Sequence, residues 1–130
     1  MSTWSIQDSA SLYGIPSWGR DFVSVSQDGH LLVGPEGRGL APVDLKHLVD
    51  DMQRRGIDLP ILIRFPDVLA ARVDGLARAF QDAIHEHGYT GAYRGVYPIK
   101  VNQQRHLVEH MVQTCRQHHM GLECGSKPEL

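Results

Sequence analysis

The chain reads GVYPIKVNQ from Gly95 to Gln103, a short apolar stretch that contains a lysine near its end. This pattern predicts a buried strand over residues 93–100, with a helix beginning directly behind it. Because α/β enzymes place their chemistry at the C-terminal ends of parallel strands, Lys100 is the first candidate for a catalytic amine. The alternative is a solvated lysine that buries only its stem, and the spacing alone favours this alternative.

The pattern around this stretch alternates between helix and strand after Asp44. Helices are expected from a cap at Asp44 to Gly56, over residues 69–84 up to Gly88, and from a cap at Asn102 to Gly121. Strands are expected over residues 59–65, 93–100 and 122–124. Strict alternation predicts an α/β fold with a parallel sheet of these three strands, joined by right-handed crossovers.

The first part of the chain has a different organisation. Residues 1–20 mix aromatic residues with glycine and proline and predict an irregular lead-in. Residues 22–26 and 30–33 predict a β-hairpin, closed by Asp28-Gly29 as a two-residue type I′ turn. The glycine-rich residues 34–39 predict a connector, because a phosphate cradle would sit between a strand and a helix. We therefore expect a hairpin segment over residues 1–43 and the first β/α units over residues 44–130.

The last residues predict the opening of another helix. Ser126 and Glu129 have the spacing of a capping box, with Pro128 in the first turn. Three parallel strands would leave the faces and edges of a sheet open. We therefore expect the chain to be the N-terminal piece of a larger enzyme. The alternative is a free-standing binding or regulatory module that has lost catalysis, which a stop codon directly after Leu130 would support.

Composition excludes several function classes. The 130 residues carry a formal net charge of −2 and have no basic stripe interleaved with aromatic residues, so nucleic acid is not the expected partner. Neither a leader sequence nor an apolar run long enough to span a membrane is visible, which predicts a cytoplasmic protein. The two cysteines, Cys115 and Cys124, are expected to be reduced thiols.

Two patterns could bind a metal, but each has a simpler explanation. His106, Glu109 and His110 spell the H-x-x-E-H pattern of some zinc proteases. No third protein ligand is specified, so a solvated helix face explains this pattern better. A second set of possible ligands (Cys115, His118, His119 and Cys124) fits no closed zinc template. Cys115 falls on the apolar face of its helix and is expected to be a buried core thiol.

Lys100 and Glu123 are coupled by the expected strand register. Both lie at the C-terminal ends of successive parallel strands, so their side chains could approach each other at a barrel mouth. A carboxylate near a lysine can stabilise the amine or exchange protons with it. A structural salt bridge would explain the same pairing equally well.

Four segments of the chain resemble the biosynthetic arginine decarboxylases, which are pyridoxal-phosphate enzymes of the alanine-racemase-like barrel group. The two longer segments are YPIKVNQ (97–103) and GLECGSKPEL (121–130). The two shorter ones are YGIPSWG (13–19) and LIRFP (62–66), which occur in the same order. The resemblance extends from about Tyr13 to Leu130.

This resemblance implies a fold, a reaction and a site. The chain would form the opening part of a pyridoxal-phosphate-binding (β/α)8 TIM-type barrel, preceded by a hairpin of an associated β-domain. The whole enzyme would convert L-arginine to agmatine and CO2 in polyamine biosynthesis, that is, of putrescine and spermidine. Lys100 matches the lysine that forms the Schiff base with the cofactor, Glu123 matches an acid near that lysine, and Glu129 matches an acid close to the cofactor.

The resemblance also implies what the chain lacks. Magnesium is implied as a second cofactor, but its ligands, the phosphate site and most of the substrate pocket would lie outside these residues. A complete barrel needs about 250 residues, so the 130-residue chain is expected to be inactive alone. The whole enzyme is expected to be a homo-oligomer.

Overall fold

A computed structural model describes residues 3–35 and 41–130 of the chain. The chain divides into two compact units, Met1–Val68 and Leu69–Leu130. The glycine-rich connector expected over residues 34–39 falls mostly outside the described residues. The division expected between residues 43 and 44 concerns domains of a longer protein and stays a prediction.

The N-terminal unit begins with two short helices, α1 (Ile6–Leu12) and α2 (Ile15–Trp18). The prediction of an irregular lead-in was therefore wrong. Ser5 and Asp8 form a capping box, in which the Ser5 side chain accepts from the Asp8 amide and the Asp8 carboxylate accepts from the Ser5 amide. These hydrogen bonds satisfy amides that have no partner within the helix, so α1 forms although its sequence contains few strong helix formers.

The predicted hairpin is confirmed, although its turn differs. Strands β1 (Val23–Val25) and β2 (Leu31–Val33) pair antiparallel, with Val25 opposite Leu31. The Ser26 amide donates to the His30 carbonyl at 2.8 Å, so three residues form the loop. The Gly29 amide donates to the Ser26 carbonyl, and Gly29 has φ +81°. A type I turn followed by a left-handed glycine is the common three-residue hairpin loop.

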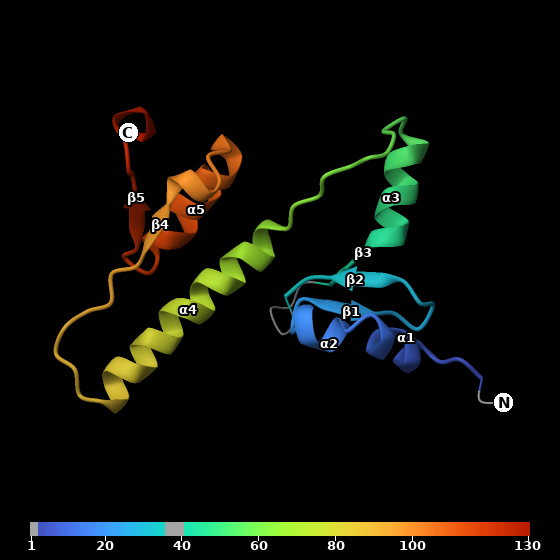
Figure 1. The fold of residues 1–130 in the computed structure, drawn as a ribbon, viewed down its shortest axis with the longest axis horizontal. Coiled ribbons are helices and arrows are strands. Elements are labelled where there is room, and N and C mark those ends of the chain that lie inside the picture. Colours follow the sequence, from blue (N-terminus) through green and yellow to red (C-terminus); the bar gives the residue numbers. More distant parts are fainter. Residues whose placement is uncertain (1–2, 36–40) are drawn as a thin grey trace. The chain divides into compact units, whose positions relative to one another are not determined.

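A third strand completes the antiparallel sheet of this unit. Strand β3 (Val43–Asp44) pairs with β2, and helix α3 (Leu45–Arg54) follows directly. The predicted cap at Asp44 is confirmed, because its Oδ1 atom accepts from the His47 amide at 3.0 Å. In Figure 1, α1 and α2 lie beside β1, whereas α3 lies beyond β3.

Residues 59–65 do not form the expected strand. They form neither a helix nor a strand, and Leu59-Pro60 is a cis peptide bond. The side chain of Leu62 is 76% exposed. A strand needs a neighbour to satisfy its amides and carbonyls, and no described strand pairs with this segment. The apolar sequence alone could not reveal this.

The C-terminal unit contains one parallel strand pair. Strands β4 (Val96–Pro98) and β5 (Gly121–Glu123) are joined through α5 (Arg105–Arg116), and Tyr97 lies opposite Leu122. This confirms the predicted β/α/β order. The described residues hold two parallel strands rather than three, because residues 59–65 do not join them.

The core of this unit lies between its two long helices and β4. Helix α4 (Pro66–Glu86) begins just before the boundary and follows the predicted apolar spacing. Its residue Val73 packs with Met111 and Cys115 of α5, and partly buried side chains extend this cluster: Leu69, Tyr97 and Met120. The prediction of a buried Cys115 is confirmed, since it is 1% exposed.

Four boundaries in this unit differ from the predictions. A 3-10 helix, η1 (Ile99–Val101), follows β4, so Lys100 lies in a turn behind the strand. Helix α5 begins at Arg105 rather than behind Asn102, whose Oδ1 accepts from the Gln104 amide at 3.1 Å. Gly121 is the first residue of β5 rather than the end of α5. Ser126 precedes only a short 3-10 helix, η2 (Lys127–Glu129).

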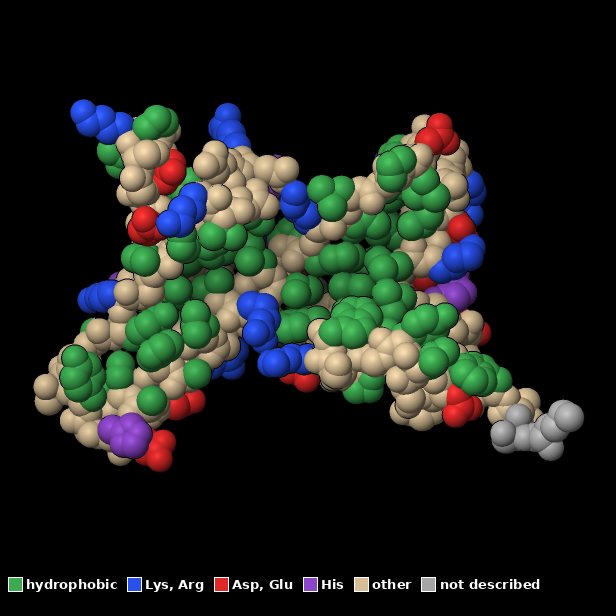
Figure 2. Space-filling view, in the orientation of Figure 1, with side chains coloured by type: hydrophobic (Ala, Val, Ile, Leu, Met, Phe, Trp, Pro, Cys, Tyr) green, Lys and Arg blue, Asp and Glu red, His purple; other side chains and the backbone are tan. Residues whose placement is uncertain are grey.

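Many large apolar side chains reach the surface of both units. Figure 2 shows apolar surface between the charged side chains, and the exposed residues include Leu12, Tyr13, Trp18 and Val101. No helix among the described residues is long and apolar enough to cross a membrane.

Candidate active site

Lys100 projects from η1, directly behind the C-terminal end of β4. Its side chain is exposed, so the amine is open to a reactant in this chain. A local hydrogen bond supports the backbone around it, because the Tyr97 hydroxyl donates to the Asn102 carbonyl across the turn at 3.4 Å. An accessible primary amine at a strand end can act as a nucleophile toward a carbonyl group.

The parallel register brings Glu123 to the same end of the strand pair. Glu123 lies opposite Pro98, and Lys100 follows Pro98 by two residues. The Glu123 side chain is partly buried, whereas Lys100 is exposed. The structure thus places both candidates at the C-terminal end of the strand pair, as the sequence predicted, while the role of each stays a prediction.

Glu129 organises the loop that follows β5. Its Oε2 atom accepts from the Gly125 amide at 2.7 Å, and its Oε1 atom accepts from the Ser126 hydroxyl at 3.1 Å. The predicted capping box does not form, because the Ser126 side chain accepts from no amide of η2 and the Glu129 carboxylate accepts from the Gly125 amide rather than that of Ser126. A Cβ atom built on Gly125 would lie 3.6 Å from Glu123 Oε1 and 3.8 Å from Glu129 Oε2. The two candidate acids therefore flank this glycine.

A hollow of about 330 Å3 lies next to this end of the strand pair. Ile99 and Gln103 line it from the segment around Lys100, Glu129 and Pro128 from η2, and three residues from α5: Arg105, Val108 and Glu109. Arg105 Nε donates to Glu109 Oε1 at 2.7 Å, and this bond raises the pKa of Arg105. Arg105 was not among the predicted site residues, although its spacing of four residues from Glu109 on a helix could have indicated the pair.

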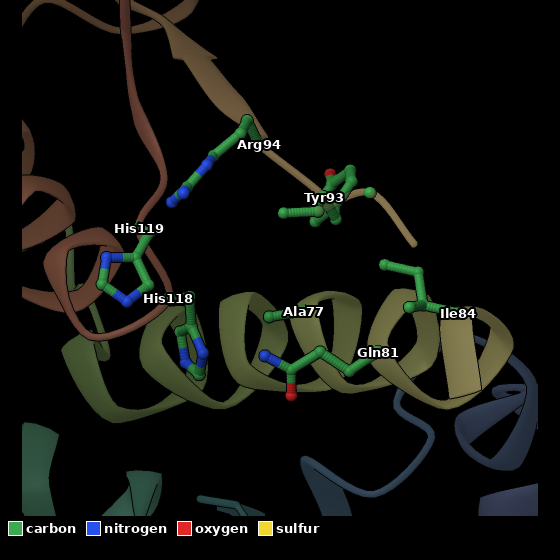
Figure 3. A pocket seen from close by; sticks show the side chains of 9 residues that line it. Ala77, Gln81, Ile84, Tyr93, Arg94, His118 and His119 are labelled. Carbon is green, nitrogen blue, oxygen red and sulfur yellow. The ribbon is translucent and has the colours of Figure 1, made fainter. Parts of the chain in front are cut away.

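The two sets of possible metal ligands for which the sequence favoured simpler explanations form no metal-binding group among the described residues. Glu109 pairs with Arg105, and the partly buried His110 leaves its Nε2 atom without a hydrogen-bond partner. His118 instead bonds Asp74 of α4, with 2.6 Å between Nε2 and Oδ1. Figure 3 shows His118 and His119 near Arg94 at a second hollow, of about 250 Å3, whose floor is α4.

A different group of ligating side chains is present in the N-terminal unit. Donor atoms of His30, Asp44 and His47 all lie within 4.8 Å of one another. These residues are 14 and three positions apart in the sequence, so no short motif could have indicated them. Pairing of β2 with β3 brings them together.

Comparisons with known proteins agree with the resemblance in sequence. No family model matches the chain. It is 52% identical to the biosynthetic arginine decarboxylase of Gloeobacter violaceus over 130 residues, which cover 100% of the chain and 20% of that protein. It is 48% identical to the biosynthetic arginine decarboxylase of Prochlorococcus marinus over 98% of the chain and 20% of that protein.

A crystal structure of a relative supports the mixed α/β fold. The biosynthetic arginine decarboxylase of Campylobacter jejuni superposes with a TM-score of 0.79 at 31% identity, over 90% of this chain and 19% of that chain. The chain thus spans about a fifth of the length of the relatives it matches. Over its whole length, it is homologous to one segment of the biosynthetic arginine decarboxylases.

Proposed function

We propose that this chain is the lysine-bearing segment of an enzyme that converts L-arginine to agmatine and CO2 in polyamine biosynthesis. The observation that carries this proposal is the place of Lys100, directly behind β4 of a parallel β4–α5–β5 unit. Relatives that are 44% to 52% identical over nearly the whole chain carry the name biosynthetic arginine decarboxylase. The mixed α/β fold supports the proposal, since parallel strand ends are where such enzymes place their reacting groups.

Pyridoxal phosphate fits the amine and the carboxylates at the C-terminal end of the strand pair. Lys100 offers an exposed primary amine that would hold the cofactor's carbonyl carbon. When bound, the cofactor supplies the electron sink that decarboxylation of an amino acid requires. Glu123 would hold or exchange a proton near the amine, and Glu129 would fix the adjoining loop beside the cofactor through Gly125 and Ser126.

The barrel and the domain assignment belong to the same proposal. Residues 44–130 would supply the first β/α units of a (β/α)8 barrel, and residues 1–43 would contribute the hairpin to a β-domain. Exposed apolar side chains in both units support this, because further strands and helices of a longer protein would cover them. Leu62, 76% exposed, lies within residues 59–65, and Val101, 70% exposed, ends the turn that follows β4. Cytoplasmic location and assembly into a homo-oligomer follow from the same family assignment.

Magnesium lacks a matching ligand set among the described residues. The group His30, Asp44 and His47 offers two imidazole nitrogens and one carboxylate. Magnesium prefers oxygen ligands in an octahedral arrangement. Its role in the whole enzyme therefore stays an expectation from the family resemblance.

A chimeric enzyme tests the proposed function. The 130-residue chain would replace the corresponding fifth of the Gloeobacter violaceus protein, and agmatine formed from L-arginine would be measured. We expect the chimera to decarboxylate arginine and Lys100→Ala to reduce turnover to background. Matched controls are Lys46→Ala and Lys127→Ala, which remove the other lysines of the chain and should retain turnover.

The outcome is informative only if the chimera folds, so helix content and pyridoxal-phosphate absorbance are recorded for each variant. A folded Lys100→Ala chimera that retains both arginine turnover and the cofactor absorbance would refute the assignment. A folded chimera that binds the cofactor but turns over only another amino acid would refute the substrate.

A further inference from the structure

The N-terminal unit brings together three metal-ligating side chains from three elements. His30 directly precedes β2, Asp44 ends β3, and His47 lies in the first turn of α3. Leu32 is the register partner of Asp44, and His30 precedes Leu32 by two residues. Side chains two residues apart on a strand share one face, so His30 is the diagonal neighbour of Asp44 across the sheet.

The donor atoms of the three side chains lie within 4.8 Å of one another, close enough to bind one ion together. His30 Nδ1 lies 2.8 Å from Asp44 Oδ2, and His47 Nδ1 lies 3.5 Å from the same oxygen. Ligands of a tetrahedral zinc ion with bonds of about 2.0–2.2 Å stand roughly 3.3–3.6 Å apart. The His47–Asp44 distance has this spacing, whereas the His30–Asp44 contact is a hydrogen bond that would lengthen when an ion binds. The two imidazole rings meet edge to face, with an interplanar angle of 83°, and both Nδ1 atoms approach Asp44.

The two carboxylate oxygens of Asp44 have different partners, the helix backbone for one and the histidine side chains for the other. Oδ1 accepts from the His47 amide at 3.0 Å, while Oδ2 faces the two imidazoles. A hydrogen bond to the second oxygen orients a metal-binding carboxylate, and its charge offsets the positive end of the α3 dipole.

We propose that His30 Nδ1, Asp44 Oδ2 and His47 Nδ1 bind one zinc-class transition-metal ion, with a fourth position taken by water. Two imidazoles and a carboxylate suit Zn2+, Co2+ or Ni2+, whereas Mg2+ prefers oxygen ligands. The side chains of His30 and Asp44 are 26% and 21% exposed, and that of His47 is 73% exposed. The ion can thus enter from the side of His47, and it would link β2, β3 and α3.

Metal titration of the tag-free, chelator-treated 130-residue chain tests this proposal. Isothermal titration with ZnCl2 and visible absorption with CoCl2 should each give one ion per chain, and a large excess of MgCl2 should not compete. Zinc should also raise the unfolding temperature. We expect His30→Ala and His47→Ala to weaken binding at least about tenfold, as loss of a ligand or its support typically does.

The controls separate this group from the other candidate ligands. Asp44→Asn keeps a good helix-capping residue but removes the charge, so it should weaken binding in a chain with unchanged helix content. His118→Ala removes the histidine–aspartate pair of the C-terminal unit, and His106→Ala interrupts the H-x-x-E-H pattern; both variants should bind the metal as the parent does. Absence of saturable binding, or binding unchanged in folded His30→Ala, His47→Ala and Asp44→Asn variants, would overturn the proposal.

Discussion

The two thiols of the C-terminal unit occupy opposite environments. Cys115 is 1% exposed in the core, and burial raises the pKa of its thiol. Cys124 is partly exposed behind β5. Because the thiolate is the reactive form, iodoacetamide should modify Cys124 in the folded chain at least about tenfold faster than Cys115.

Peptide mapping by mass spectrometry after timed alkylation measures both rates. Denatured chain provides the control, since both thiols should then react at similar rates. Equal rates in the folded chain would contradict the buried position of Cys115.

Asp44 should make the stability of the N-terminal unit depend on pH. The hydrogen bond from the His47 amide is the main cause that holds its folded-state pKa below the ordinary 3.8. A carboxyl group with a lowered pKa stabilises the fold above its unfolded-state pKa, and this contribution is lost as pH falls through the lower, folded value. Urea unfolding should therefore show stability falling below about pH 4.

The matched variant for this prediction is Asp44→Asn, which keeps the cap without a titrating group. Its stability should change less with pH over the same window than that of the parent chain. Some dependence should remain, because hydrogen bonds from Ser5 and Lys46 also lower the pKa values of Asp8 and Asp50. An identical pH profile for parent and variant would argue against the role of Asp44.

At the scale of elements, two exposed glycines should respond to alanine in opposite directions. Gly29 closes the hairpin loop with φ +81°, a conformation that costs alanine about 1 kcal/mol or more. Gly75 lies inside α4, and a Cβ atom there meets nothing within 4 Å. Alanine should therefore stabilise α4 by about 0.5–1 kcal/mol.

Thermal or urea unfolding of Gly29→Ala and Gly75→Ala checks this pair, each serving as the control for the other. A stabilising Gly29→Ala change would show that the hairpin loop has another conformation. A destabilising Gly75→Ala change would show that this position of α4 is not open helix surface.

Elements with a local cause could be predicted from the sequence. The hairpin follows from alternation around Asp28-Gly29, and α3 from its cap at Asp44. Residues 59–65 have the composition of a buried strand, but strand formation depends on a partner elsewhere in space. The expected two-residue type I′ turn requires a positive φ at both Asp28 and Gly29. The Asp-Gly dipeptide permits this conformation without requiring it, and in the structure Gly29 has a positive φ whereas Asp28 does not. The sequence therefore did not define the length of the loop.

Some parts of the candidate site could be predicted from the sequence, and others could not. The β/α/β order predicted Lys100 and Glu123 at the same end of the strand pair, and the structure agrees. The local bonds of Glu129 to Gly125 and Ser126 depend on backbone geometry that spacing does not define. The group His30, Asp44 and His47 arises from strand pairing between separated segments, so it was invisible in the sequence.

At the scale of the whole molecule, the chain should hold too little structure for catalysis. The described residues hold one parallel strand pair, whereas the proposed barrel takes about 250 residues to close. Supplied with pyridoxal phosphate and L-arginine, the isolated 130-residue chain should release no CO2 above background. Catalytic turnover by the isolated chain would contradict this prediction, and the active chimera described above is the positive control.

The central claim is that Lys100 holds the cofactor, and covalent trapping tests it most directly. The chimera would be loaded with pyridoxal phosphate, reduced with sodium borohydride, digested and mapped by mass spectrometry. The chain contributes three lysines, Lys46, Lys100 and Lys127, so the map is unambiguous within it. We predict a single pyridoxyl group on Lys100; labelling of Lys127, or of a lysine outside this chain, with Lys100 unmodified would contradict the claim.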